Sequence, residues 1–374
     1  MHNNLHKGEK TLLLSLIKKR FNMKHTRFIL VLSCFILIFN SCSTDVDLYA
    51  DYKDIAIVYA MLNPKADTNY VKIIRAFCGT NDDPIDANEV ALIADSSNYP
   101  GKLDVRLIEL KNTYGNSYEP TGRILMFDTL TLHNKEEGVF YSPDQKVYYT
   151  DESLASASGG NKYAYQLIVV KPNGDTITAR TKMVGNEDFK LISGSVSFQK
   201  SQSNALGKIV FRADGAAPVY DIKMQFNYLE QHEGQAIRSK SISRSFGTKP
   251  LSSFAKVPNT ENSYYQEYSV NWLFNALESA IGNDTVVNPN HPNVVRYIDG
   301  FTISISAAGE ELLYHYNSNQ AQNESPLTMV TPVTNIKGGY GLFCSRTTIE
   351  KEAKLSAKAK SDLFGIRSWG FKEH

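Results

Sequence analysis

The sequence predicts a mainly β fold, made of two β-sandwich domains of the immunoglobulin-like kind with a few short helices in the second. In DIKMQFNY (residues 221–228), apolar and polar side chains alternate, and FTISIS (residues 301–306) alternates in the same way. Because successive side chains of a strand point to opposite faces, this period of two is typical of a half-buried strand. Many short strands with turn signals between them favour sandwiches over a parallel α/β sheet.

Further segments are predicted as strands from their content of β-branched and aromatic residues. With the two above they are, in chain order, residues 55–62, 70–77, 103–110, 146–150, 163–170, 175–184, 208–214, 221–228, 239–246 and 301–306. The fifth and sixth are separated by KPNG (residues 171–174). Proline, asparagine and glycine suit a tight turn, so these two strands are expected to form a hairpin.

Three segments interrupt the strand pattern. In NWLFNALESAIG (residues 271–282), apolar residues recur at helical spacing, with an asparagine to cap the start and a glycine to cap the end. GEELLYHYNSNQ (residues 309–320) predicts a second helix, with His315 on its apolar face. EKEAKLSAKAKSDL (residues 350–363) is polar almost all round and follows a capping-box pattern from Thr347, so it predicts a short surface helix.

The N-terminal part contains an apolar run, residues 28–39, that is too short to span a bilayer. A spanning helix needs about 20 residues, whereas a signal-peptide core needs roughly 7–15. Lys24 and Arg27 precede the run, and Ser41 stands directly before Cys42. The segment resembles a bacterial lipoprotein signal, which implies that Cys42 is acylated and becomes the new N-terminus. An uncleaved anchor or a buried strand is the alternative.

The domain organisation follows from this interpretation. Residues 1–41 comprise an upstream extension before Met23 and then the signal peptide, and the polar, acidic residues 42–53 form a tether. A break near KMVGNED divides the rest into an N-terminal β-sandwich, residues 54–185, and a C-terminal β-rich domain with short helices, residues 186–374.

The charge balance argues against a nucleic-acid partner. Seven Lys and Arg and one Glu precede Cys42, so that part carries +6, whereas the whole chain carries +1. The residues from Cys42 onward therefore carry −5. Nucleic-acid binding needs concentrated positive charge to replace phosphate counterions. The predicted contact is instead with a membrane, through the acyl chains on Cys42.

The four cysteines show no metal-binding or redox spacing. Cys34 leaves with the signal and Cys42 carries lipid, which leaves Cys78 and Cys344. In an oxidising envelope these two can pair, or they can remain as two buried thiols. The sequence leaves both states open.

No catalytic pattern is found. QHEGQ, at residues 231–235, lacks the second histidine of a metalloprotease helix, and no G-x-S-x-G elbow is present. GTNDDPIDANE places Asp82, Asp83 and Asp86 together as weak calcium candidates, but without the EF-hand spacing. We therefore predict no enzyme activity, no cofactor and no catalytic residue. Pairs of carboxylates that meet only in the fold stay open.

The last third of the sequence carries a family resemblance. PVTNIKGGYGLFCSR (residues 332–346) resembles the closing motif of a large, uncharacterised family of Bacteroidetes outer-membrane lipoproteins, a domain of unknown function. The upstream ELLYHYN and the segment at residues 55–77 resemble the family's aromatic helix and its opening hairpin. The motif residues that carry the match most clearly are Asn335, Gly338, Gly339, Gly341 and Phe343. Glycines permit positive φ or close backbone approach, and asparagine can close a turn, so a structural role is expected.

The resemblance implies a location and a role. Members of the family are often encoded beside TonB-dependent transporters, which implies an outer-membrane lipoprotein with a non-enzymatic binding or accessory role, assisting such a transporter or another envelope protein. The alternative is a lipid-anchored glycan-binding or glycan-active protein with its site in a cleft between domains. Two facing carboxylates with stacked aromatics in a deep cleft would favour this alternative.

Overall fold

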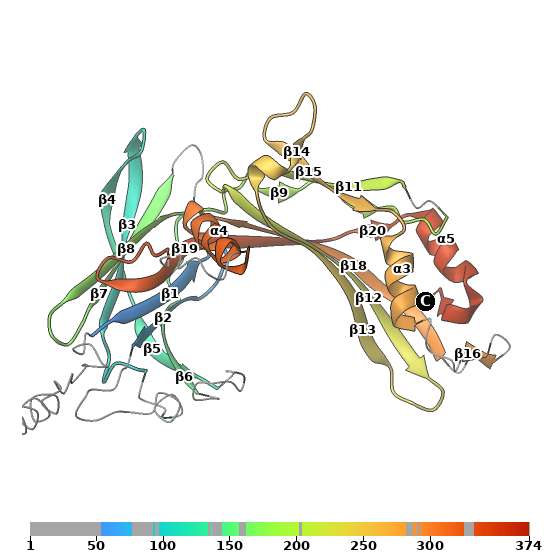
Figure 1. The fold of residues 1–374 in the computed structure, drawn as a ribbon, viewed down its shortest axis with the longest axis horizontal. Helices are drawn as coiled ribbons and strands as arrows, with labels where there is room; N and C mark the ends of the chain where they lie inside the picture. Colours follow the sequence, from blue (N-terminus) through green and yellow to red (C-terminus); the bar gives the residue numbers. More distant parts are fainter. Residues whose placement is uncertain are drawn as a thin grey trace, which may run out of the picture. The chain divides into compact units, whose positions relative to one another are not determined.

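The computed structural model confirms the mainly β fold, with 55% of its described residues in strands and 13% in helices. It describes residues 54–76, 93, 97–133, 136, 144–156, 162–201, 204–281, 287–288, 291–292, 294–324 and 333–373 (Figure 1). All of these residues belong to one compact unit. Each of the ten predicted strand segments overlaps a strand of the structure.

The largest sheet has nine strands in the spatial order β13-β12-β18-β19-β1-β2-β6-β5, with β21 paired to β18. They are β1 (Ala56–Leu62), β2 (Asn69–Arg75), β5 (Asp128–Leu132), β6 (Gln145–Thr150), β12 (Val219–His232), β13 (Arg238–Pro250), β18 (Val294–Ala308), β19 (Gly339–Glu352) and β21 (Phe371–Lys372). Strands β1 and β19, far apart in the sequence, lie parallel, with Ala56 beside Gly339 and Leu62 beside Ser345. The other neighbours along this order are antiparallel.

Two four-stranded sheets complete the main architecture, in the orders β4-β3-β7-β8 and β14-β15-β11-β9. The first consists of β3 (Asp104–Tyr114), β4 (Ser117–Met126), β7 (Tyr163–Val170) and β8 (Thr176–Lys182). The second consists of β9 (Lys190–Leu191), β11 (Leu206–Arg212), β14 (Ala255–Lys256) and β15 (Ser263–Ser269). Two short pairs are β10 (Ser195–Val196) with β20 (Lys354–Leu355), and β16 (Val287–Asn288) with β17 (His291–Pro292).

In the described part of the chain, the helices are short and lie after residue 250. They are α3 (Trp272–Ile281), α4 (Glu310–Glu324), α5 (Ala357–Gly365) and the 3₁₀ turns η1 (Leu251–Ser253) and η2 (Arg367–Trp369). The first two confirm the helices predicted at residues 271–282 and 309–320. In α3, Phe274 is buried and its ring stacks on Trp369, with 6.2 Å between ring centroids. Of the helices that the structure describes, none is both long enough and apolar enough to cross a bilayer.

The buried side chains form two clusters. One takes its residues from the strands between Ala56 and Met183 together with Ile336 and Phe343. The other takes its residues from Val184 onward. The first cluster lies between the β1 end of the large sheet and strands β3, β7 and β8. The second cluster lies between strands β12 and β18 of the large sheet and strands β11 and β15, with helices α3 and α5. Strand β19 contributes side chains to both clusters, because Phe343 lies in the first cluster and Ile349 packs against the second. The division at residue 185 stays a prediction.

The prediction of a helix over residues 350–363 is wrong for its first half. Strand β19 runs to Glu352, β20 follows, and α5 begins only at Ala357. Ser356, not Thr347, caps this helix, since the Ala359 backbone N–H donates to Ser356 Oγ at 3.2 Å. The helix is also less solvated than expected, because Ala359 and Leu363 are buried in the second cluster.

Candidate functional site

Several predicted site residues lie outside the described residues. They are the lipidation site Cys42, the calcium candidates Asp82, Asp83 and Asp86, and Cys78. Cys344 is a buried free thiol. Burial, reinforced by the nearby charge of Glu311, raises the pKa of Cys344 to about 12. Across the described part of the chain, no group of three or more His, Cys, Asp and Glu could hold a metal ion.

The side chain of Asn335, in the closing motif, hydrogen-bonds to the backbone of β19 as a neighbouring strand would. Its side-chain Oδ1 accepts a hydrogen bond from the Phe343 backbone N–H at 2.9 Å, and its Nδ2 donates to the Phe343 carbonyl at 2.6 Å. Nδ2 also lies 3.3 Å from the Arg180 carbonyl on β8. One amide thus satisfies both backbone groups of Phe343, whose side chain is fully buried in the first cluster.

The glycines of the motif allow β19 to approach its neighbours closely. A Cβ on Gly339 would stand 2.7 Å from the Ala56 carbonyl oxygen, and one on Gly341 would overlap the Val58 carbonyl. Gly338 and Gly341 also adopt positive φ, at 81° and 114°, which side chains rarely tolerate. Gly339 and Gly341 therefore belong to the junction between β1 and β19, whereas a Cβ on Gly338 would stand 3.0 Å from the Thr176 carbonyl oxygen of β8.

One cavity in the described part of the chain has a volume of about 530 Å³. Its walls come from the end of β8, the β11–β12 connection, η1 and the first turn of α4. The lining residues are Lys182, Ala213, Asp214, Gly215, Ala216, Ala217, Pro218, Pro250, Leu251, Ser252, Asn262, Gly309, Glu310, Glu311 and Leu313. We call this hollow the acidic cavity, since it has three carboxylates against one lysine. None of its lining residues is aromatic.

Glu311 is the unusual group in the acidic cavity. Burial raises its pKa to about 7, against the opposing effects of its own backbone N–H and of the Thr181 hydroxyl. Its Oε2 has no hydrogen-bond partner within the described residues. That oxygen lies against Gly309, where an added Cβ would come within 2.6 Å of it. A buried carboxyl with a raised pKa is a common mark of functional sites, but it also occurs where packing alone imposes burial.

Asp214, by contrast, is occupied by backbone donors. Its Oδ2 accepts from the backbone N–H groups of Gly185 at 2.5 Å and Asn186 at 2.9 Å. Its Oδ1 accepts from Asn186 Nδ2 at 3.1 Å and from the Ala216 N–H at 2.8 Å. This carboxylate therefore holds the chain in place at the predicted domain break.

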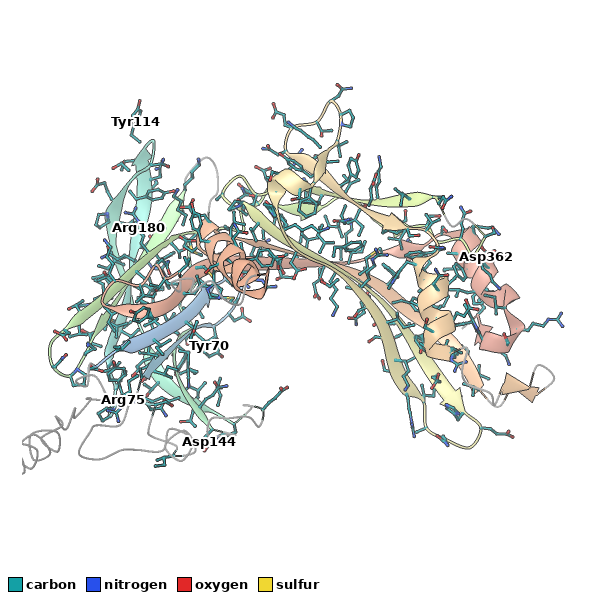
Figure 2. The ribbon with its side chains drawn as sticks, in the orientation of Figure 1. Tyr70, Arg75, Tyr114, Asp144, Arg180 and Asp362 are labelled. Atoms are coloured by element: carbon teal, nitrogen blue, oxygen red, sulfur yellow. The ribbon has the colours of Figure 1, made fainter. Side chains whose placement is uncertain are left out.

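A second feature is an aromatic surface on the large sheet, which we call the tyrosine face: Tyr59, Met61, Tyr70, Tyr340 and Leu342. The register places Tyr59 beside Leu342 of β19, so their side chains share the face opposite the first cluster. Leu342 is buried, but the other four are 43–49% exposed. A groove of about 370 Å³ follows this face, lined by all of these except Tyr340. Figure 2 labels Tyr70 on β2.

The turn at one end of the groove is rigid. The Asn63 backbone N–H donates to Asn69 Oδ1 at 2.7 Å, and Asn69 Nδ2 donates to the Asn63 carbonyl at 3.2 Å. The Asn63 side chain in turn accepts from the Thr347 hydroxyl at 3.1 Å. The groove is therefore formed in the free protein, which lowers the entropic cost of binding to it.

The tyrosine face is not among the sites predicted from the sequence. The signal lay in residues 55–62, where the positions between the buried residues are also apolar. A strand whose outer face is solvated normally alternates with polar residues. A strand that is apolar on both faces therefore indicates a second contact surface.

Comparisons with known proteins add no function. No protein-family model matches the chain, and no curated protein matches it. Among solved structures, CBD12 from CALX1.2 is 7% identical and has a TM-score of 0.16, with 80% of this chain and 99% of that chain covered. The C-terminal globular domain of oligosaccharyltransferase from Pyrococcus abyssi is 10% identical with the same TM-score, and 83% of this chain and 53% of that chain are covered. Similarities this weak carry no argument.

Proposed function

We propose that this chain is a lipid-anchored, non-enzymatic binding protein of the outer membrane, attached through Cys42, and that its tyrosine face docks on another envelope protein. The resemblance of its closing motif to outer-membrane lipoproteins supports a TonB-dependent transporter as that partner. The anchor is proposed from the sequence alone, because Cys42 lies outside the described residues.

The observation that carries this proposal is the tyrosine face. Single exposed apolar residues are ordinary, but contiguous ones on a soluble surface mark interaction sites. Tyrosine and methionine are enriched in protein–protein interfaces, where charged residues are depleted from the centre. Tyr59, Met61, Tyr70 and Tyr340 are each close to half exposed on one sheet surface. Their strands are fixed in the sheet, so little order has to be imposed when a partner binds.

The acidic cavity supports a non-enzymatic role. Asp214 uses its oxygens to hold backbone N–H groups. That leaves Glu311 as the one buried carboxyl in the lining with an unmatched oxygen, and this oxygen is covered by Gly309. General acid–base chemistry needs a group within hydrogen-bond reach of a substrate.

The test is a pull-down from solubilised membranes with the tagged, full chain. A double variant, Tyr59→Thr with Tyr340→Thr, removes two aromatic rings but keeps β-forming residues. Capture of the partner should fall by roughly tenfold or more, as expected for the loss of central interface tyrosines. The matched control is Tyr114→Thr, because Tyr114 is 87% exposed at the tip of the β3–β4 hairpin (Figure 2).

Two results would reject the proposal. One is the absence of any envelope protein in the captured material. The other is capture that the control and the face variant reduce equally. Mass spectrometry of the processed polypeptide tests the anchor separately, since it requires acyl groups on residue 42.

Glycan binding remains the second candidate, and one observation favours it. Tyr59 and Tyr70 line the same groove, and aromatic rings in a concave site can stack on sugars. Strong retention on a glycan array that Tyr59→Thr abolishes, with no co-purifying protein, would replace the first proposal by this one.

A further inference from the structure

Strand β13 ends the large sheet and leaves one edge open in the described part of the chain. The sheet order places β12 on one side of β13 and no strand on the other (Figure 1). The eight residues 238–245 pair regularly with residues 223–230 of β12. In an antiparallel pair, about half of the backbone N–H and C=O groups of an edge strand point away from its neighbour. Such an edge is a template for one more strand.

The far end of β13 is protected, whereas the regular part is not. The pairing shifts between residues 221 and 223 of β12, next to Gly247, which has a φ of 74°. A bulge of this kind twists an edge away and blocks further pairing. From Arg238 to Ser245 there is no bulge, no proline and no glycine. The open edge is therefore limited to these residues.

This edge is basic, although the chain from Cys42 onward is acidic. Strand β13 carries Arg238, Lys240, Arg244 and Lys249 and no Asp or Glu. None of these four forms an ion pair with a described carboxylate. Arg238 contacts Gln235, Lys249 contacts Gln266, and Arg244 lies over the ring of Phe246. The charge of Lys240 contributes to lowering the pKa of Glu230.

The register fixes the side-chain pattern that a new strand would meet. Lys240, Ile242 and Arg244 stand beside Tyr228, Phe226 and Met224, so all three lie on the face of the second core cluster. The serines between them lie on the other face. A strand added beside β13 would thus meet a basic, an apolar and a basic side chain in succession on one face. A complementary segment has acidic residues flanking an apolar one, since opposite charges across strands are favourable.

From this edge and its charge, we propose that residues 238–245 of β13 bind an extended acidic segment of a partner protein by strand addition. A second copy of the chain is not the occupant, because pairing two β13 edges would set Lys and Arg against Lys and Arg. If the charges of β13 served only to prevent aggregation, the strand would not prefer acidic extended peptides over other peptides. This interaction is independent of the tyrosine face, which lies on β1, β2 and β19.

The probe is a short fluorescent peptide of alternating threonine and glutamate, with valine at the position opposite Ile242. Fluorescence polarisation with the full chain should show saturable binding that weakens as salt rises. A peptide with lysine in place of glutamate should not bind, and neither should one in which the valine and its two neighbouring threonines are all replaced by proline. The proline version keeps the charge but cannot supply the strand's hydrogen bonds.

Variants locate the site. Lys240→Glu with Arg244→Glu should weaken peptide binding by about tenfold or more, because two attractive cross-strand pairs become repulsive. The matched control is Lys190→Glu with Lys256→Glu, which makes the same change in net charge at exposed positions of another sheet. Hydrogen exchange supplies the structural readout: peptide binding should slow exchange at alternate amides of residues 238–245 and not elsewhere.

Several outcomes would overturn the proposal. They are equal binding of the proline-containing peptide, equal effects of the two double variants, or peptide binding without amide protection in β13. Sedimentation that shows a dimer broken by the Lys240 and Arg244 changes would assign the edge to a second copy. Binding to phosphatidylglycerol vesicles over phosphatidylcholine vesicles, lost in the same variant and without peptide binding, would assign the charge to a lipid surface.

Discussion

At the scale of single residues, the protonation of Glu311 makes the stability of the fold depend on pH. Its carboxyl titrates at a pKa of about 7, above the ordinary value of 4.5, mainly because it is buried. Between these two values the folded chain holds a proton that the unfolded chain has lost. The contribution of Glu311 to the free energy of unfolding is therefore complete below the lower value and is lost as pH rises through 7.

We expect Glu311→Gln to remove this pH dependence. Above pH 7 the variant should be the more stable protein, by on the order of 3 kcal/mol, since it has no buried charge to form. Near pH 4.5 the two should be similar. Urea unfolding at several pH values measures the difference, and Glu310→Gln, an exposed neighbour in the same helical turn, is the control. A stability curve that keeps its slope in the Glu311 variant would contradict the assignment.

The residues of the closing motif show what sequence could and could not predict at this scale. A structural interpretation of Asn335 and the glycines followed from their backbone chemistry alone. The residues that the glycines contact could not be predicted in this way. Ala56 and Val58 lie some 280 positions away, and the sequence does not show which strand β19 pairs with. The tyrosine face was missed for the same reason: exposure is a property of the assembled sheet.

At the scale of elements, one buried ion pair connects three segments. Arg296 of β18 donates through Nε to Glu230 Oε2 of β12 at 2.8 Å and through Nη1 to the Trp369 carbonyl of η2 at 2.9 Å. Arg296 is 1% exposed and Glu230 is 8% exposed. Burial alone would raise the pKa of Glu230, but the hydrogen bonds and charge of Arg296 outweigh it and lower the pKa. The stability from this pair is thus present above the ordinary range of Glu and is lost on acidification.

Arg296→Met should destabilise the fold by about 3–5 kcal/mol, because the buried charge of Glu230 would lose its main partner and keep only the His232 ring nitrogen at 3.2 Å. The double variant Arg296→Met with Glu230→Leu should recover most of this loss, since apolar groups of similar volume can replace a buried pair. Thermal unfolding of both variants at neutral pH provides the comparison. If the double variant were less stable than the single one, the pair would contribute more than the relief of a buried charge.

The positions of the secondary-structure elements were the feature predicted best from the sequence. The segments with alternating or β-branched residues all form strands, because a half-buried sheet imposes a period of two. Strand β4 was missed because proline and glycine interrupt it and because its side chains are mostly exposed. The helix predicted at residues 350–363 begins later in the structure. Thr347 and Glu350 resemble a capping box in the sequence, but both lie in β19 and pair with residues of β18.

At the scale of the whole molecule, the two core clusters share β19. Residues 54–185 expressed alone would lack Ile336, Phe343 and the parallel neighbour of β1. We expect this fragment to show no cooperative thermal unfolding. The same fragment with residues 333–347 joined to it by a flexible linker should regain a transition, measured by circular dichroism. A cooperative transition in the short fragment would instead establish residues 54–185 as an independent domain.

The parallel pairing of β1 with β19 also sets an order of events during synthesis. Ser345 donates from Oγ to the Leu62 carbonyl, which lies 283 positions earlier in the chain. A nascent polypeptide emerges N-terminus first, so the edge of β1 stays uncovered until the chain has been synthesised as far as β19. Contacts this distant in sequence form slowly. Strand β1 therefore keeps that edge open from its own synthesis until β19 has been synthesised, and during this interval residues 56–62 are exposed to aggregation.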